Sequence, residues 1–501
     1  MSQEIELKLS LPAKALPALR RHPLFAAAAR QGNAATLDNT YFDTPELALK
    51  ARKVALRIRR QGRARLQTVK CSAPSAGGLT QRPEWEQPYA DAFDFSLVDA
   101  PKVLKLLQRH ETELAPVFST RFRRETRLHA SGDGVRILMM VDTGEVIAGE
   151  RRQPICELEL ELVEGSPLDL LLLACRLAAD LPLLPDDVSK AERGYRLHLG
   201  ERPAPLRAEA SSIDAQQTPV EAFRSLAFSC VRQWQANAAG AQASEDPEFI
   251  HQLRVALRRL RSLLALFAPV LPAEFVDDWR ERLKQNADHF AAARDLDVLY
   301  EEVLAPVADA ADIDDPALSR LQAIGLAARN DARVDAAHQL DPAAQGRLLI
   351  GFTAALHALP SGEADAGPDL HDFVRQQLDR LRRKVRRRHE AAADRVPARL
   401  HALRIALKRL RYGLEFFAPL VADKAGKRYL REVIRAQNAL GFVNDVEVAR
   451  GRLLAWADED PDLRAAAGFV CGWHAPRAAR LARRVLRELE PLLWGKAPWK
   501  R

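Results

Sequence analysis

Charged side chains recur at every second position in several short segments of the first 200 residues. Successive residues of a strand point to opposite faces, so the run EIELK at 4–8 places Glu4, Glu6 and Lys8 on one face and apolar residues on the other. Carboxylates that share a face repel one another unless a cation binds between them. Clustered carboxylates are the ligands that a hard divalent cation such as Mg²⁺ requires, and the pattern therefore predicts a metal site.

The same spacing returns in later segments. Charges that share a face are Arg57 with Arg59, Glu84 with Glu86, and Glu157 with Glu159 and Glu161. Paired guanidinium groups supply forked donors that suit phosphate oxygens. For any single strand, the simpler interpretation is the solvent face of an amphipathic strand. If all of these faces line one barrel, they form a polar chamber with acidic and basic walls, and such a chamber would bind a metal–polyphosphate complex.

A second pattern, H-x-x-R-x-x-x-[RK]-R-x-R, occurs at 251–261 and again at 401–411. Its offsets of 0, 3, 7 and 10 stay on one face of a helix. The two basic stripes are His251, Arg254, Arg258 and Arg261, and His401, Arg404, Lys408 and Arg411. One such stripe would be an ordinary solvated face, whereas its repetition favours anion binding. Neither histidine has a His or a carboxylate at i+4, so we do not expect these helices to bind a metal.

A very basic run, RQQLDRLRRKVRRRHE, lies between the two stripes at 375–390. Its charges circle the helix, so they create positive potential rather than a face, and solubility is the alternative explanation. Its predicted anion-binding residues are Arg382, Arg383, Arg386 and Arg387. The acidic residues Asp295, Asp297, Asp445 and Glu447 are expected to orient basic neighbours. Because no aromatic residues are interleaved to stack on bases, we expect inorganic phosphate chains rather than nucleic acid, held with a steep salt dependence.

The elements that position these residues differ between the two halves of the chain. Short alternating runs at 4–8, 54–60, 64–70, 82–87, 121–128, 135–142 and 155–162 predict an antiparallel sheet or barrel, with helices around 12–30 and 167–180. Helical periodicity predicts helices at 219–240, 247–268, 273–300, 316–340, 371–392, 397–418, 425–457 and 475–492. The overall prediction is an α+β protein with an all-β domain followed by an all-α domain.

The helical half contains an internal repeat. IHQLRVALRRLRSLLALFAPVL at 250–271 realigns with LHALRIALKRLRYGLEFFAPLV at 400–421, an offset of 150 residues. Two divergent copies of one helical unit, packed about a pseudo-twofold axis, explain the match most simply. We therefore expect a first domain at 1–200, a linker without periodicity at 201–218, and a helical domain at 219–501.

Composition excludes several classes of protein. The chain has 501 residues, 75 Lys and Arg against 67 Asp and Glu, and a net charge of +8, which permits an anionic partner without requiring one. Five scattered cysteines form no C-x-x-C pair, which argues against a disulfide framework and a zinc site. We find no signal peptide, and charges interrupt the apolar stretch 168–184. These features predict a soluble, cytoplasmic protein without a membrane partner.

The first 200 residues resemble the CYTH superfamily, the triphosphate tunnel metalloenzymes. The landmarks that carry the resemblance stand in family order: EIELK (4–8), LRIR (56–59), TVK (68–70), QRPEWE (81–86), FSTRFRRE (118–125), VDTG (141–144), ICELELEL (155–162) and SKAERGY (189–195). The resemblance implies an eight-stranded antiparallel tunnel that hydrolyses triphosphates with Mg²⁺ or Mn²⁺ as cofactor.

Carried over residue by residue, the resemblance implies two sets of site residues. Metal ligands would be Glu4, Glu6, Glu157 and Glu159, with Glu161 and Asp142 close by. The phosphates would be gripped by Lys8, Arg57, Arg59, Lys70, Arg124 and Lys190, and Arg82 and Glu84 would line the tunnel. Lys8 is either a general base, which would need its pKa lowered by neighbouring cations, or a phosphate contact, which we favour.

The second half resembles the CHAD domain, a helical module often found beside CYTH domains and associated with inorganic polyphosphate. Together the two resemblances imply an inorganic triphosphatase that cleaves tripolyphosphate to pyrophosphate and phosphate and carries a polyphosphate-binding domain, like the CYTH–CHAD inorganic triphosphatases of bacteria. Two alternatives remain: a polyphosphate-recruiting protein with weak hydrolysis, and a nucleotide-directed tunnel enzyme such as an adenylate cyclase or a thiamine or nucleoside triphosphatase.

Overall fold

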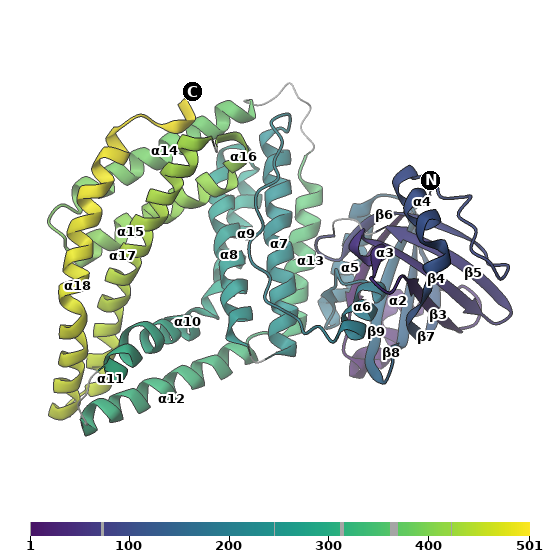
Figure 1. Ribbon diagram of the computed structural model, residues 1–501, viewed down its shortest axis with the longest axis horizontal. Helices are drawn as coiled ribbons and strands as arrows, with labels where there is room; N and C mark the ends of the chain where they lie inside the picture. The colour runs from purple at the N-terminus through teal and green to yellow at the C-terminus, as the bar shows by residue number, and fades with distance from the viewer. Residues whose placement is uncertain are drawn as a thin grey trace. The chain divides into compact units, whose positions relative to one another are not determined.

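The computed structural model describes residues 2–71, 75–244, 246–310, 315–360, 369–421 and 423–500 (Figure 1). They divide into two units. The N-terminal unit comprises Met1–Pro205, Ala238–Gly240 and Asp341–Ala358, and the C-terminal unit comprises Leu206–Asn237, Ala241–Leu340 and Leu359–Arg501. Within the described residues, no helix combines the length and the apolar character needed to cross a membrane.

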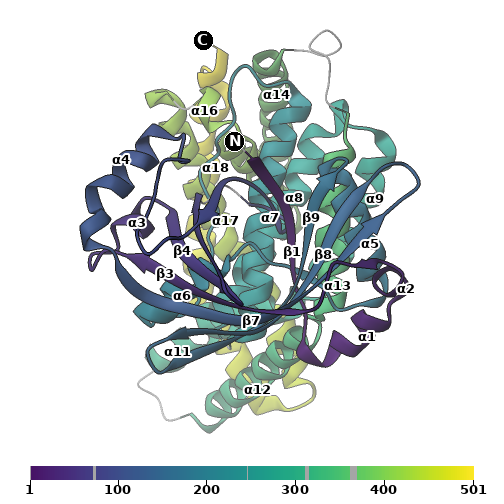
Figure 2. The ribbon, with the colours of Figure 1, turned by 90° about the vertical axis from the view of Figure 1, so that its right-hand side faces the viewer.

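The N-terminal unit is built on an antiparallel sheet whose strands curve around a common interior (Figure 2). The strands are β1 (Ser2–Ser10), β2 (Ala29–Arg30), β3 (Ala35–Asp43), β4 (Val54–Gln61), β5 (Ala64–Cys71), β6 (Leu79–Pro88), β7 (Ala115–Ala130), β8 (Arg136–Ala148), β9 (Arg151–Glu164) and β10 (Leu184–Pro185). Their order is β1-β6-β5-β4-β3-β7-β8-β9, and β9 pairs with β1, so these eight strands close a barrel. The predicted eight-stranded antiparallel tunnel is confirmed.

Residue alternation separates the two faces of the barrel. The apolar residues Leu7 and Leu9 of β1 face outward and pack with Leu158 and Leu160 of β9. Helices cover this outer face: α1 (Leu16–Arg21), α2 (Pro23–Ala26), α3 (Ala48–Ala51), α4 (Pro101–His110), α5 (Pro167–Asp180) and α13 (Pro342–Ala358). The charged alternates, among them Glu6 and Lys8, are thereby left on the inner face.

One part of the barrel interior is apolar and is filled by α6 (Lys190–Leu199). Phe118 and Phe122 of β7 pack there with Tyr195 of α6. Gly194 lies against the Phe118 ring so closely that an added Cβ would overlap it. This contact sets how deeply α6 enters the barrel, and thereby where its first residue, Lys190, lies.

The C-terminal unit is helical. Its helices are α7 (Pro219–Ala243), α8 (Pro247–Phe267), α9 (Ala273–Asp288), α10 (Ala291–Val298), α11 (Ala305–Ala310), α12 (Pro316–His338), α14 (Leu370–Ala391), α15 (Pro397–Phe416), α16 (Ala418–Val421), α17 (Lys424–Ala457) and α18 (Pro461–Trp494). The repeat is visible in this order, because α8 and α15 begin at prolines 150 residues apart. The copies diverge afterwards, since α9 and α10 are separate helices whereas α17 is continuous.

Several elements differ from the sequence-based prediction. The helix expected at 12–30 is two short helices followed by β2, and the helix expected at 273–300 breaks after Asp288. Strand β3 and helices α4, α6 and α13 had no predicted counterpart. The buried residues of β3 are Leu37, Asn39, Tyr41 and Asp43, so this strand lacks the charge alternation that marks the others. The buried residues of α13 spread over more than one face, so this helix lacks an amphipathic pattern.

Replacing Gly194 by Ala should destabilise the N-terminal unit by about 1–3 kcal/mol, because the new methyl group must displace the Phe118 ring. Denaturant unfolding followed by intrinsic fluorescence measures this free energy. Gly132→Ala is the matched control, since no atom lies within 4 Å of the added Cβ there. Equal unfolding midpoints for the two variants would contradict the proposed packing of α6.

Candidate active site and basic pockets

A cavity of about 450 Å³ lies inside the barrel. Its lining carries charged side chains from six strands and α6: Glu4, Glu6, Lys8, Arg57, Arg59, Lys70, Glu84, Glu86, Arg124, Glu159, Glu161 and Lys190. The closed sheet brings these residues together from distant parts of the sequence. Among the predicted site residues, Asp142 and Glu157 do not line the cavity and are fully buried, while Arg82 lies opposite Glu4 on β6 with its side chain outside the described part of the chain.

One wall of the cavity is acidic. Glu6 on β1 lies directly opposite Glu161 on β9 in the strand register. Burial, together with the negative charges of Glu4 and Glu6, raises the pKa of Glu161 to about 7. Lys70 lies nearby and binds Glu4 at 2.9 Å and Glu84 at 2.7 Å, yet its charge does not offset the crowding at Glu161. This wall would be stabilised by a further cation.

A deeper acidic group is neutralised by the chain itself. Carboxylate oxygens of Asp142, Glu157 and Glu159 lie within 4.8 Å of one another. The Lys190 ammonium contacts Glu157 and lies 2.7 Å from Asp142 and 2.8 Å from Glu159. Burial opposes the charge of Lys190, but these three carboxylates outweigh it and raise the pKa of that lysine. Arg124 also pairs with Asp142, at 2.6 Å, and with Glu159.

The opposite wall is basic and incompletely paired. Nε and Nη2 of Arg57 are buried and have no hydrogen-bond partner among the described residues. The neighbouring charge of Arg57, followed by burial and Arg124, lowers the pKa of Arg59 to about 10. Glu84 and Glu86 lie 3.8 Å from Arg57 and Arg59, too far for hydrogen bonds. Phosphate oxygens would supply acceptors for these two Arg57 nitrogens, whereas Arg59 Nε already donates to Asn39 Oδ1 at 3.1 Å.

Lys8 is held by the segment that follows β10. Its ammonium donates to the Val188 carbonyl oxygen and lies 3.7 Å from Asp186. Its backbone N–H donates to the Gly78 carbonyl at 3.0 Å, and its carbonyl accepts from the Asp186 N–H at 3.0 Å. These contacts fix Lys8 at the cavity wall without assigning it the role of a base or of a phosphate contact.

Sequence reasoning missed several residues of this site. Tyr41 lines the cavity; burial raises its pKa, but Arg57, Lys190 and Arg59 outweigh burial and lower it overall. Arg193 pairs with Asp186 at 2.7 Å and with Glu157 at 3.5 Å. Arg193 follows Lys190 by three residues, which is the helical spacing that would have indicated a shared face.

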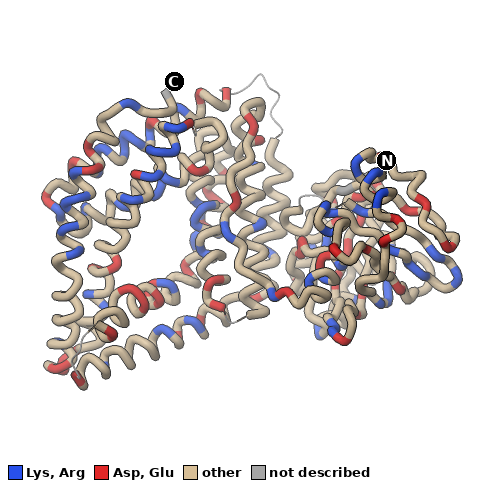
Figure 3. Tube along the Cα trace, viewed as in Figure 1, with Lys and Arg blue, Asp and Glu red and all other residues tan. Residues whose placement is uncertain are grey.

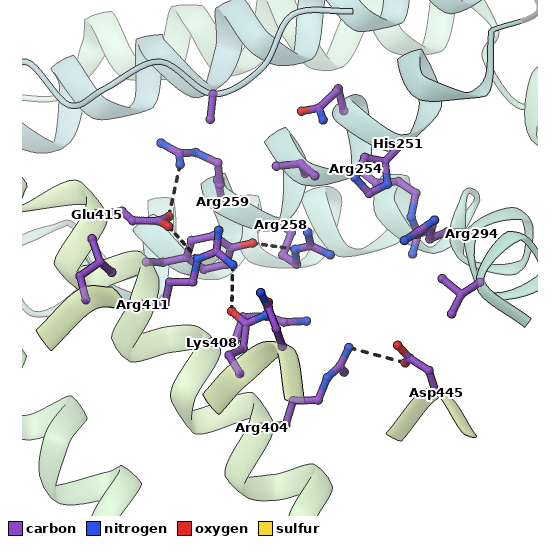
Figure 4. A pocket seen from close by; sticks show the side chains of 18 of the residues that line it. His251, Arg254, Arg258, Arg259, Arg294, Arg404, Lys408, Arg411, Glu415 and Asp445 are labelled. Atoms are coloured by element: carbon purple, nitrogen blue, oxygen red, sulfur yellow. Dashed lines mark hydrogen bonds and ion pairs between the residues drawn. The ribbon is translucent and has the colours of Figure 1, made fainter. Parts of the chain in front are cut away.

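Lys and Arg recur along the helices of the C-terminal unit (Figure 3). The two basic stripes meet at a pocket of about 1150 Å³ within this unit (Figure 4). The stripe residues that line it are His251, Arg254, Arg258, Arg404, Lys408 and Arg411. Buried leucines on the opposite sides of α8 and α15 fix the direction of these side chains. Sequence reasoning missed Arg294, Arg259 and Lys427, which extend the same lining.

Positive charge in this pocket exceeds what its acids neutralise. Asp445 lies 3.8 Å from Arg404, and Glu415 lies 2.7 Å from Arg411. Arg254 Nη1 and Arg404 Nε are nevertheless buried without hydrogen-bond partners among the described residues. Burial, followed by the charges of Arg258 and Arg404, lowers the pKa of Lys408 to about 7.

A second pocket of about 590 Å³ shares Arg258, Lys408 and Tyr412 with the first. Its other basic residues are Arg261, Arg280, Arg380, Lys384, Arg387 and Arg409, and its described lining contains no acidic residue. Burial and four neighbouring arginines lower the pKa of Lys384. The two pockets together form a basic region from α8 to α14.

Other predicted binding residues have different surroundings. Arg382 is buried and donates to the carbonyls of Leu492 and Gly495, while Arg386 donates to Leu493 at 2.7 Å. These contacts secure the end of α18 with one nitrogen of each guanidinium group, whereas Arg382 Nε is buried without a hydrogen-bond partner among the described residues. Arg383 and His401 are exposed and line neither pocket.

The four acidic residues predicted to orient basic residues have different partners. Only Asp445 pairs with a residue of the basic stripes, because Asp297 binds Arg333 at 2.7 Å and Glu447 lies 3.9 Å from Arg450. Asp295 lines the first pocket and opposes the lowering of the pKa of Arg254. Two of the four acids therefore lie beside the stripes, and the other two pair with basic residues elsewhere.

Comparisons with known proteins assign the two parts of the chain to two families. The CYTH domain family matches residues 2–195, and the CHAD domain family matches residues 225–454. An inorganic triphosphatase of Haemophilus influenzae is 32% identical over 197 residues, which are 39% of this chain and 55% of that protein. The match thus spans about half the length of this curated relative.

Two solved structures are also similar. The CHAD domain from the plant Ricinus communis is 31% identical, with a TM-score of 0.48, over 57% of this chain and 96% of its own. HpAC1 from Hippeastrum, described as having a dominant triphosphatase activity, is 20% identical, with a TM-score of 0.30, over 40% of this chain and 97% of its own.

Lys408→Met should stabilise the protein at pH 6, because it removes a cation that the folded state holds unfavourably. Between pH 7 and the ordinary lysine pKa of about 10.4, the unfolded wild type keeps a proton that the folded wild type releases, so wild-type stability rises with pH. The advantage of Lys408→Met should therefore shrink above pH 7. Denaturant unfolding at pH 6 to 9 measures this difference, with Lys424→Met, at an exposed site, as the matched control. An advantage that does not change with pH would contradict the crowding at Lys408.

Proposed function

The chain belongs to the CYTH family through residues 2–195 and to the CHAD family through residues 225–454, and from this membership we propose that its barrel hydrolyses inorganic triphosphate with a divalent metal. One observation carries the proposal: a single cavity brings together an acidic wall and a basic wall, and each wall crowds like charges. The raised pKa of Glu161 marks the first wall, and the lowered pKa of Arg59 marks the second. A metal ion would relieve the repulsion on the acidic wall, and triphosphate oxygens would relieve it on the basic wall.

The acidic wall fits a divalent cation. Its carboxylates are hard oxygen donors, and their mutual repulsion is the property that a bound cation would relieve. Glu4, Glu6 and Glu161, with Glu159 adjacent, would hold Mg²⁺ or Mn²⁺, which would neutralise charge on phosphate oxygens and lower the pKa of a bound water. Asp142 and Glu157 instead anchor Lys190 and Arg124, and so act on the site indirectly.

The basic wall would position the substrate. Arg57 would bind phosphate oxygens through Nε and Nη2, which have no hydrogen-bond partner among the described residues, and Arg59 would bind them beside it. Lys8, on β1, would contact the phosphate chain. Hydrolysis then joins a water oxygen to the terminal phosphorus while the bridging P–O bond breaks, which leaves pyrophosphate and phosphate. Positioning and charge neutralisation supply most of the catalysis in such a reaction.

The lining favours an inorganic substrate over a nucleotide. Tyr41 and Phe122 are the aromatic side chains in the described lining, and they are 3% and 2% exposed. Neither offers an open face on which a base could stack. Tripolyphosphate is therefore the substrate that we propose.

We assign the C-terminal unit to the binding of inorganic polyphosphate. Its first pocket combines two facing basic stripes with buried guanidinium nitrogens that lack partners among the described residues. The acid-free second pocket extends this positive region, so a linear polyanion longer than the first pocket could continue into it.

Glu6→Gln should lower kcat for tripolyphosphate by about a hundredfold or more, because the variant loses a metal-binding carboxylate. Phosphate release with and without Mg²⁺ measures the effect, and chelation of divalent metal should abolish wild-type turnover. Glu150→Gln, at an exposed position, is the matched control. Near-normal turnover in Glu6→Gln would refute the assignment of the site, and tight polyphosphate binding without wild-type turnover would favour the recruitment alternative.

Reversing charge at both stripes, Arg254→Glu with Arg404→Glu, should weaken polyphosphate binding by at least about tenfold and flatten its salt dependence. Turnover of tripolyphosphate should stay within about twofold, because both residues lie outside the barrel. Binding to labelled polyphosphate across a salt series tests this. Arg431→Glu with Arg480→Glu changes net charge equally at exposed positions outside both pockets. Equal binding in the two double variants would show that the stripes have no specific role.

A further inference from the structure

Helix α13 belongs to the CHAD part of the sequence but not to the CHAD part of the structure. It lies between α12 and α14, inside the residues that match the CHAD family, yet it folds with the N-terminal unit. Its buried residues spread over more than one face of the helix, and they are Gln345, Gly346, Leu349, Ile350, Phe352, Thr353, Ala354 and Leu356. A helix that is buried over more than one face is a core element of the fold that contains it.

Two small residues let α13 approach the barrel closely. At Gly346 an added Cβ would overlap the carbonyl oxygen of Leu183, the residue before β10. At Gly77 an added Cβ would overlap the Thr353 side chain, so the turn before β6 lies directly on α13. Ile350, between these two contacts on α13, is fully buried in the outer core of the barrel.

The two segments that α13 touches are the ones that hold Lys8. The turn supplies the Gly78 carbonyl, which accepts from the Lys8 N–H at 3.0 Å. The segment after Leu183 supplies Asp186, whose N–H donates to the Lys8 carbonyl, and Val188, whose carbonyl accepts from the Lys8 ammonium.

The same two segments are also tied to each other. Asp187 accepts hydrogen bonds from the Gly78 N–H at 2.9 Å and from the Ser75 hydroxyl. A shift of either segment would therefore be transmitted to the other, and Lys8 would move with both. Because α13 abuts both segments through residues without space to spare, it limits such shifts.

We infer that α13 positions Lys8 in the tunnel, with Gly346 and Thr353 as its positioning residues, so that the catalytic barrel is completed by a helix encoded within the CHAD sequence. The inference rests on the proposed function for its effect on turnover, whereas its effect on the structure around Lys8 is independent of that function. A displacement of about 1 Å in a positioned group can lower turnover about a hundredfold, so small changes in α13 should be detectable.

Gly346→Ala and Thr353→Leu, each in the full chain, should lower kcat for tripolyphosphate at least about tenfold, with a smaller change in KM. Hydrogen exchange should accelerate at the amides of Lys8 and Gly78 in both variants. Thr353→Val should retain wild-type kcat, because it preserves shape and removes a buried hydroxyl that has no hydrogen-bond partner among the described residues. Arg347→Ala, exposed on the same helix, is the matched control.

The outcomes separate the two proposals. An inactive wild type would refute the proposed function, and hydrogen exchange at Lys8 and Gly78 would then decide the inference by itself. An active wild type whose Gly346→Ala and Thr353→Leu variants keep both kcat and slow exchange would overturn the positioning role of α13. Should Thr353→Leu fail to fold, Gly346→Ala and Thr353→Val still provide the contrast.

Discussion

Closure of the sheet is the constraint on which the N-terminal unit depends. Because β9 pairs with β1, every second residue of the eight strands points into one interior. A charged side chain at such a position cannot turn through the sheet to the solvent outside the barrel. The interior therefore has to neutralise its own charges. It does so completely around Lys190, which lies among three carboxylates, and incompletely at Glu161 and Arg59. At Lys190 the opposite charge comes from the protein itself, whereas at Glu161 and Arg59 a ligand would supply it.

Period-two alternation made most of the barrel predictable from the sequence. The inward position of Glu6 and Arg57 follows from the residue types of their own strands. Neutralisation was not predictable, because it depends on contacts between segments far apart in the chain. Lys190 is the example: its sequence surroundings allow a phosphate contact, whereas three buried carboxylates from β8 and β9 hold its ammonium. Strand β3 was missed for a related reason, since Asn39 and Tyr41 face inward without charge.

Helical periodicity was similarly informative where one face is apolar and the other charged. It placed Arg254 and Arg404 on faces that meet at one pocket, because leucines bury the opposite sides of both helices. It failed where charges circle the helix. On α14, Arg382 and Arg387 are five residues apart in a basic run interrupted only by Val385, yet one is buried against carbonyls at the end of α18 and the other lines the second pocket. Composition alone cannot distinguish an arginine that is bonded within the protein from one that lines an open pocket.

Because of α13, the boundary between the two families along the sequence differs from the boundary between the two structural units. A family match at 225–454 describes a continuous segment, whereas the N-terminal unit includes residues from within that segment. A barrel cut out at residue 205 would lose Ile350 and Ala354 from its outer core and would expose apolar surface of α5, against which α13 packs. Poor folding or low turnover of such a fragment would then reflect an incomplete core rather than a missing polyanion pocket. The two domains thus belong to different families and contain different sites. A cut between their sequences would nevertheless leave the N-terminal unit without α13.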